Sequence, residues 1–247
     1  MLILLPPSEG KTAPVADEPV DLAALAFAAE LTERRQKLLG ALEALGSVPR
    51  KRAVAMLGIS PSQAGEIAID VGLRGAASAP AAEVYSGVLY DRLGLADLPA
   101  AAGEKVLIAS ALWGVLQPGD RIPYYRLSAK AKLTRIGPLA AFWRESLAAA
   151  MPDEPGDLVV DARSGAYAAA WKPKQATLLA VRAFSESGGK RKPVSHMAKA
   201  VRGEVVRALL AAKKTPATPE AAATIAEAAG FTVELAPGNL DVIVPPC

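Results

Sequence analysis

The sequence is short of metal ligands: it has one cysteine, Cys247, and one histidine, His196, among 247 residues. A disulfide within the chain is therefore excluded, as is a zinc or iron–sulfur site built from its own cysteines. Iron favours histidine and carboxylate ligands, and the sequence has no tight carboxylate cluster. We therefore predict no metal and no cofactor, and any acid–base chemistry must come from Lys, Tyr, Asp, Glu or the single imidazole.

Long hydrophobic runs are also absent. No stretch approaches the roughly 20 apolar residues that are needed to cross a bilayer. The apolar residues 1–5 are followed by Pro6 and Pro7 and have no basic region before them, which is not the pattern of a secretory signal. We expect a cytoplasmic protein with no membrane partner, and the lack of paired cysteines agrees with this.

The composition is that of a folded chain, with 51% hydrophobic and 21% charged residues. Predicted strands alternate irregularly with amphipathic helices, which favours an α+β fold (mixed α/β) over a doubly wound sheet. We predict one domain over residues 1–247, with a mixed sheet and flanking helices. The predicted strands are 1–5, 105–109, 157–161, 176–184, 231–235 and 240–244, and the predicted helices include 137–151, 193–213 and a segment capped by Thr218.

A helical subregion, residues 21–82, interrupts the predicted strands. Within it, residues 56–67 (MLGISPSQAGEI) have the pattern of a helix-hairpin-helix turn. Gly58 would allow a sharp backbone turn, Ile59 would pack beneath it, and Ala64 would let the two helices approach closely. A structural hairpin that binds no ligand is the alternative interpretation.

The residue after this turn, Ser60, starts a predicted capping box with Pro61 and Gln63. We expect the second helix to begin at once, with free N–H groups that suit a phosphate oxygen. Lys51 and Arg52 lie one to two helical turns upstream and could add phosphate contacts. Such a module binds the nucleic-acid backbone and reads no bases.

Basic residues are concentrated in two stretches. Residues 121–144 contain six basic and no acidic residues, and residues 172–214 contain eleven basic and two acidic residues. If the two stretches meet in space, they form a positive surface that attracts polyanions. The alternative is two solvated helix faces that point in different directions.

Several polar residues near strand ends and loops favour a second hypothesis, an enzyme that acts on a nucleotide, a modified base or another small anion. The string at residues 8–12, SEGKT, lacks the first glycine of a P-loop, so a nucleotide triphosphatase is not expected. A lysine or tyrosine with a shifted pKa could serve as acid, base or nucleophile. The catalytic candidates are Lys11, Tyr85, Ser110, Arg126, Ser164 and Tyr167.

Ordered segments across nearly the whole chain follow one known pattern. The strongest is SALWGVLQPGDRIPYYRL at residues 110–127. The others are the opening strand and loop that end in Lys11-Thr12, VYSG at 84–87, Ser164 with Tyr167, the triplet Lys172-Pro173-Lys174, and AKAVRG at 198–203. In this order and spacing they resemble the YaaA family of bacterial peroxide-stress proteins.

The resemblance implies a single-domain α+β fold with a positively charged cleft and a helix-hairpin-helix-like element. It also implies DNA binding, and protection from hydrogen peroxide through iron homeostasis, by limiting free intracellular iron and hence DNA oxidation. Together with the charge distribution and the hairpin pattern, this predicts a protein that binds double-stranded DNA independently of its sequence. It places Lys11, Arg126, Lys172, Lys174, Lys199 and Arg202 along one cleft. The full predicted DNA- or anion-binding set is Lys11, Lys51, Arg52, Gly58, Ile59, Ser60, Arg126, Lys172, Lys174, Lys199 and Arg202.

Three positions depart from the family pattern. Tyr124 stands where the family has proline, and Ser128 and Ala166 stand where it has glutamate. If the two glutamates orient basic residues or take part in a reaction in other family members, this chain performs that role by other residues or lacks it.

Overall fold

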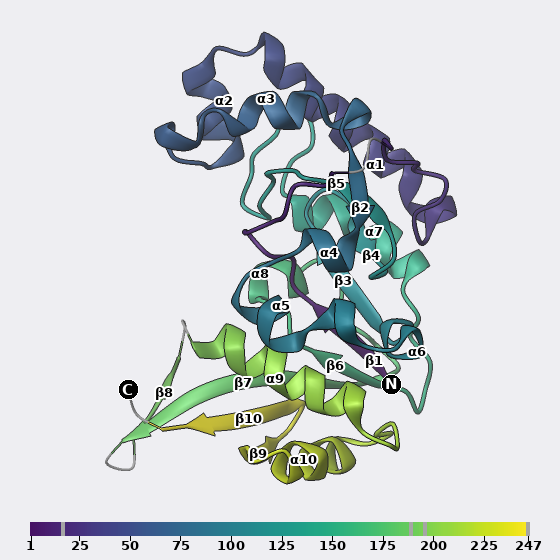
Figure 1. The fold of residues 1–247 in the computed structure, drawn as a ribbon, viewed down its shortest axis with the longest axis vertical. Helices are drawn as coiled ribbons and strands as arrows, with labels where there is room; N and C mark the ends of the chain where they lie inside the picture. Colours follow the sequence, from purple (N-terminus) through teal and green to yellow (C-terminus); the bar gives the residue numbers. More distant parts are fainter. Residues whose placement is uncertain (16–17, 188–189, 195–196, 246–247) are drawn as a thin grey trace.

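The computed structural model describes residues 1–15, 18–187, 190–194 and 197–245, so His196 and Cys247 lie outside the described residues. Its centre is a sheet in the order β4-β3-β1-β6-β7-β10-β9, and β8 pairs with β7 (Figure 1). The strands are β1 Leu2–Leu5, β3 Val106–Ser110, β4 Gly114–Leu116, β6 Leu158–Asp161, β7 Thr177–Ser187, β8 Lys190–Pro193, β9 Thr232–Ala236 and β10 Asn239–Val244. Helices flank the sheet, which confirms the predicted α+β class.

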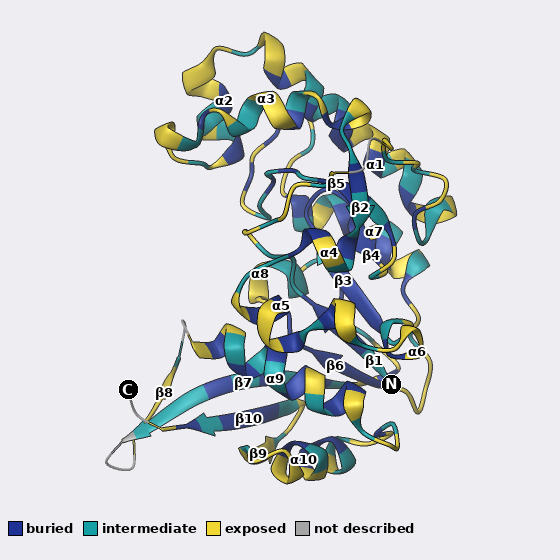
Figure 2. Ribbon diagram, viewed as in Figure 1, coloured by how far each residue is buried: buried dark blue, intermediate teal, exposed yellow. Residues whose placement is uncertain are grey.

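The middle of the sheet is parallel. β1 lies between β3 and β6, with Ile3 beside Val106 on one side and beside Val160 on the other. β7 and β10 continue the parallel order, and β4, β8 and β9 are antiparallel to their neighbours. Strands that are covered on both faces are apolar along their whole length, which is why β1 reads LILL and is almost entirely buried (Figure 2).

The helices cover the sheet and extend beyond one of its edges. They are α1 Ala28–Glu43, α2 Arg50–Leu57, α3 Glu66–Val71, α4 Ala81–Val84, α5 Val88–Leu93, α6 Ala100–Gly103, α7 Leu139–Ala150, α8 Gly165–Ala168, α9 Met197–Ala211 and α10 Pro219–Ala228. Thr218 caps α10 as predicted, since its Oγ1 accepts the backbone N–H of Ala221 at 3.3 Å. Among the described residues, no helix is long and apolar enough to cross a membrane.

Helices α1 to α3 lie together at one end of the long axis in Figure 1, away from α10. A two-stranded sheet of β2 (Ser78–Pro80) and β5 (Arg121–Pro123) lies between them and the main sheet. Buried Arg35 ties α1 to the core, because its guanidinium donates to the carbonyls of Trp113 and Val115 at 3.1 and 3.0 Å. Burial lowers the pKa of Arg35 to about 10, so it still carries its charge at neutral pH.

Two predicted helices begin later than expected. The helix predicted over residues 193–213 begins at Met197, because residues 190–193 pair with β7 instead. After Ser60 the chain makes only a 3₁₀ turn, Pro61–Gln63, and α3 begins at Glu66. Serine and glycine within residues 62–65 are poor helix formers, which accounts for the interruption. The prediction that the second helix begins immediately after the turn is therefore wrong, and the N–H groups that follow Ser60 belong to the 3₁₀ turn.

Candidate functional site

The strand order creates a crevice at one edge of the sheet. β1 and β6 are parallel neighbours, but β1 has β3 on its other side and β6 has β7 on its other side. Connections that leave two adjacent parallel strands in opposite directions open a crevice outside the carboxyl ends of those strands. Residues 6–11 follow β1 and residues 162–167 follow β6, so both segments lie at this point.

A cleft of about 720 Å³ lies there. Its volume falls within the roughly 300–1,000 Å³ that is usual for ligand sites. The lining comprises residues 6–11, 57–59, 86–90, 126–130, Ser164, Ala166, Tyr167, Lys199 and Arg202. Segments from both sequence halves, including the turn after α2 and the first part of α9, therefore meet at one site.

The charged residues of the lining are mostly basic. They are Lys11, Arg126, Lys130, Lys199 and Arg202, with Glu9 as the acidic residue. Two members of each predicted basic stretch thus reach the same cleft: Arg126 and Lys130 from the first, and Lys199 and Arg202 from the second. Ser128 and Ala166, the two positions where the family pattern has glutamate, also line it.

The predicted binding residues, taken with the catalytic candidates Ser164 and Tyr167, divide into two groups. Lys11, Gly58, Ile59, Arg126, Ser164, Tyr167, Lys199 and Arg202 line the cleft. Lys51, Arg52, Ser60, Lys172 and Lys174 are exposed and are not part of the lining. These five residues are close in sequence to residues that line the cleft, but their own side chains do not line it.

Lys11 is the half-buried cation of the cleft. The loop that carries it is held against residues 84–86 by the hydrogen bond from Thr12 N–H to Val84 O, at 2.8 Å. Its Nζ donates to Ser8 O at 2.8 Å and lies 4.5 Å from the centroid of the Tyr125 ring and 5.6 Å from that of Tyr85. Aromatic faces favour an ammonium ion over a neutral amine.

Burial opposes this effect and lowers the pKa of Lys11 from 10.5 to about 8. The positive charge of Arg126 lowers the pKa further, whereas the charges of Asp70, Glu9 and Glu66 raise it. Lys11 is therefore an amine that loses its proton close to physiological pH.

A chain of hydroxyl groups lies next to Lys11. Tyr125 Oη is 2.7 Å from Tyr85 Oη and 2.8 Å from Ser110 Oγ. Ser110 Oγ also accepts the backbone N–H groups of Leu112 and Trp113, at 3.2 and 3.1 Å. Burial raises the pKa of both tyrosines well above 10. Tyr85 and Ser110, two catalytic candidates, are therefore neutral buried groups behind the cleft wall.

Asp70 connects α3 to the segment that carries Arg126. Its side chain is fully buried, and Oδ1 accepts the backbone N–H of Arg126 at 2.7 Å. Its Oδ2 has no hydrogen-bond partner among the described residues. Burial raises the pKa of Asp70 from 3.8 to about 7, and the nearby charge of Glu66 raises it further. Sequence inspection missed Asp70, because an aspartate in a short helix has no local signature of burial.

The segment after β6 is anchored by a buried ion pair. Arg163 Nε and Nη2 donate to the two carboxylate oxygens of Asp161 at 2.9 and 2.8 Å. Arg163 Nη2 also donates to Trp171 O at 2.9 Å. The pair fixes the turn that begins α8, and Ser164 and Tyr167 line the cleft from this turn.

The turn after α2 also lines the cleft, through residues 57–59. Gly58 has φ +67°, the left-handed conformation that glycine adopts without strain. Half-buried Ile59 follows it, and Gln63 Oε1 accepts the backbone N–H of Ser60 at 3.0 Å. The backbone N–H of Lys132 donates to Met56 O at 2.7 Å, which joins this turn to the segment with Arg126.

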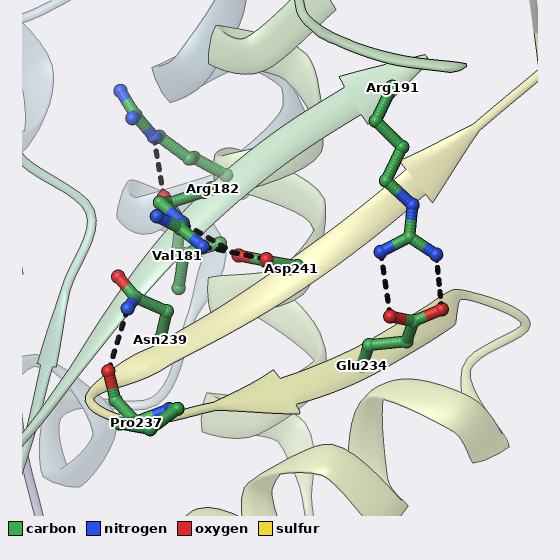
Figure 3. A network of polar contacts seen from close by, with 8 residues as sticks. Val181, Arg182, Arg191, Glu234, Pro237, Asn239 and Asp241 are labelled. Atoms are coloured by element: carbon green, nitrogen blue, oxygen red, sulfur yellow. Dashed lines mark hydrogen bonds and ion pairs between the residues drawn. The ribbon is translucent and has the colours of Figure 1, made fainter. Parts of the chain in front are cut away.

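The second basic stretch is partly neutralised by carboxylates. Arg182 on β7 forms two hydrogen bonds with Asp241 on β10, at 2.6 and 2.7 Å, and Arg191 on β8 pairs with Glu234 on β9 (Figure 3). Arg202 on α9 donates through Nε to Val181 O at 3.0 Å and also lines the cleft. The stretch is therefore split between paired sheet arginines and cations that reach the cleft.

Metal ligands do not gather in the part of the chain that the structure describes. Among those residues, no group of three or more His, Cys, Asp or Glu side chains is placed to hold a metal ion. The polar groups of the cleft, mainly amines, guanidinium groups and hydroxyls, are those that bind anions.

The fold and the cleft together define an α+β protein with cationic side chains at the carboxyl ends of its central strands. Residues 1–236 match the family described as peroxide stress protein YaaA. The chain is 43% identical over 262 residues to a UPF0246 protein of Streptomyces coelicolor, covering 99% of this chain and 98% of the relative. It is 40% identical over 247 residues to a UPF0246 protein of Corynebacterium glutamicum, covering 98% of each. The chain belongs to the YaaA family of peroxide stress proteins, which confirms the resemblance inferred from its segments.

Proposed function

We propose that this protein binds the backbone of double-stranded DNA during peroxide stress, through the cleft and the helix-hairpin-helix-like turn after α2. One observation carries the proposal: basic side chains from three segments far apart in sequence line one cleft beside Gly58 and Ile59. Cations that neutralise phosphates provide most of the affinity of sequence-independent binding. Exposed Lys51 and Arg52, on the helix before the turn, would add contacts outside the cleft.

The cellular role follows from the same proposal. A protein that covers the DNA backbone shields DNA from iron-dependent oxidation by hydrogen peroxide. The family description, peroxide stress protein, supports this role. Any effect on iron homeostasis would then be indirect, since the proposal assigns the cleft to phosphate groups.

Salt dependence tests the proposal directly. We expect affinity for a duplex, measured by fluorescence anisotropy, to fall linearly on a log–log plot with salt and to be the same for unrelated duplex sequences. The double variant Lys130→Ala/Lys199→Ala, which removes two exposed cleft cations, is expected to reduce the slope by about 1.8, at about 0.9 for each contact. The matched control is Lys213→Ala/Lys214→Ala, which removes two exposed lysines that do not line the cleft. Binding that is absent at low salt, or insensitive to salt, would rule the proposal out.

The two departures from the family pattern give a second test. Ser128→Glu and Ala166→Glu each place a carboxylate in the cleft. We expect each to weaken duplex binding at low salt by about fivefold, because a charge repelled by phosphate costs on the order of 1 kcal/mol in a partly solvated site. Ser128→Gln and Ala166→Gln match the size without the charge and should bind within about twofold of the parent. Equal affinities for the Glu and Gln variants would show that DNA does not enter the cleft.

An enzyme acting on a nucleotide, a modified base or another small anion is the second candidate. The observation that favours it is the half-buried Lys11 amine above the Tyr125 ring, beside the Tyr85–Tyr125–Ser110 hydroxyl chain. Backbone binding alone needs cations and does not need a lysine whose pKa is lowered by burial.

A further inference from the structure

We infer that Lys11 forms an imine with the aldehyde of a phosphorylated, open-chain sugar bound in the cleft. One source of such a sugar is the deoxyribose of an abasic site in DNA, and another is a free sugar phosphate. For the DNA source, the inference rests on the proposed function.

The position of Lys11 suits a nucleophile. Its side chain lines the cleft, and the rings of Tyr85 and Tyr125 lie beside Nζ on the protein side. The single hydrogen bond that the structure gives Nζ is to Ser8 O, in its own loop. No carboxylate of the described residues lies within ion-pair distance of Nζ, so the amine is not held by a counter-ion.

The electrostatic surroundings favour the reactive form of the amine. With its pKa lowered to about 8, Lys11 is neutral roughly 200-fold more often near pH 7.5 than a lysine with a pKa of 10.5. The neutral amine is the form that attacks a carbonyl carbon, and a lysine desolvated in a pocket is a recognised route to such a nucleophile. Arg cannot replace it, because a guanidinium keeps its proton in proteins.

The same cleft supplies a phosphate site. Arg126, Lys130 and Lys199 line it, and Arg126 lies close enough for its charge to lower the pKa of Lys11. An aldehyde at Nζ and a phosphate beside a guanidinium are the two ends of a phosphorylated sugar. A nucleotide-sized group fits a cleft of about 720 Å³.

The reaction is a condensation and needs no oxidant or reductant. The lone pair of Lys11 Nζ attacks the aldehyde carbon, and the carbonyl π electrons move to oxygen. The two protons of the amine pass to that oxygen, which leaves as water, and a C=N bond remains. The segment that carries Arg126 is held in place by Asp70, whose Oδ1 accepts the backbone N–H of Arg126 at 2.7 Å.

Reduction with sodium cyanoborohydride tests the inference, because it converts an imine into a stable secondary amine. The native protein is incubated separately with a duplex that contains one abasic site, with an intact duplex and with ribose 5-phosphate. We expect a covalent adduct with the abasic-site duplex, with ribose 5-phosphate or with both, and none with the intact duplex. Peptide mass spectrometry should locate the adduct at Lys11. Its rate should rise with pH through about 8, as the amine loses its proton.

Two matched variants test which amine reacts. Lys11→Arg replaces the amine with a guanidinium that keeps its proton, and we expect the adduct at residue 11 to be lost. Lys213→Arg replaces an exposed lysine outside the cleft and should form the adduct at the parental rate. If Lys11→Arg does not fold, the peptide map and the pH profile of the native protein still decide the question.

The outcomes distinguish this inference from the proposed function. Salt-dependent duplex binding with no adduct from any aldehyde ligand overturns the imine and leaves DNA binding intact. An adduct at Lys11 from ribose 5-phosphate without any duplex binding supports the imine and overturns the DNA proposal. An adduct spread over surface lysines, with a pH midpoint near 10.5, also overturns the inference.

Discussion

Gly203→Ala is expected to destabilise the protein by about 2–4 kcal/mol, which urea unfolding would measure. Gly203 lies in α9 where this helix packs against α5, and a Cβ built on it would clash with the backbone oxygen of Leu89 and lie 3.1 Å from Arg92 Cβ. A backbone carbonyl within a helix cannot rotate away, so the two helices must separate. Both helices also supply cleft residues, and we therefore expect weaker duplex binding as well.

The matched control is Gly40→Ala in α1. A Cβ at Gly40 meets nothing within 4 Å, and its φ is not positive. Because alanine is a better helix former than glycine, this variant should gain about 0.5–1 kcal/mol. If the two variants had equal stability, the close packing of α5 on α9 would be wrong.

The longer apolar strands were the most predictable part of the fold, whereas β2, β4, β5 and β8 were not predicted. Residues such as LILL in β1 and LVVD in β6 are buried throughout, and a continuous apolar run of that length reads as an interior strand. β8 was missed because its sequence, KRKP, is fully exposed and has no apolar residue. It is held by pairing with β7 and by the contact of Arg191 with Glu234 on β9, and local sequence does not encode these contacts.

The site was predictable where a single residue follows a strand or lies in a distinctive motif. Lys11 and Arg126 belong to such segments, and both line the cleft. Lys130 was missed because the predicted charge stretch does not say which of its members face the cleft. Lys172 and Lys174 lie close in sequence to Tyr167, but α8 and the turn after it leave their side chains exposed and outside the lining.

Arg163→Ala is expected to cost about 3–5 kcal/mol of stability, because it removes the counter-charge of the buried Asp161 carboxylate and leaves it the backbone N–H of residue 163 in place of a guanidinium. The side chains of Arg163 and Asp161 are 3% and 5% exposed, and the pair has two hydrogen bonds below 3 Å. Removing both charges, in Asp161→Ala/Arg163→Met, should recover part of the loss, since neither charge is then buried alone.

The exposed pair on β8 and β9 is the matched control for this effect. Arg191 makes a similar two-bond contact with Glu234, but water reaches both side chains. We expect little change in stability from Arg191→Ala, because an exposed charge that loses its partner is hydrated instead. The two arginine variants should also differ in duplex binding, because Arg163 anchors the turn that brings Ser164 and Tyr167 to the cleft. Equal unfolding midpoints for Arg163→Ala and Arg191→Ala would mean that the Asp161 carboxylate finds another partner or water, and that the turn before α8 does not depend on this pair.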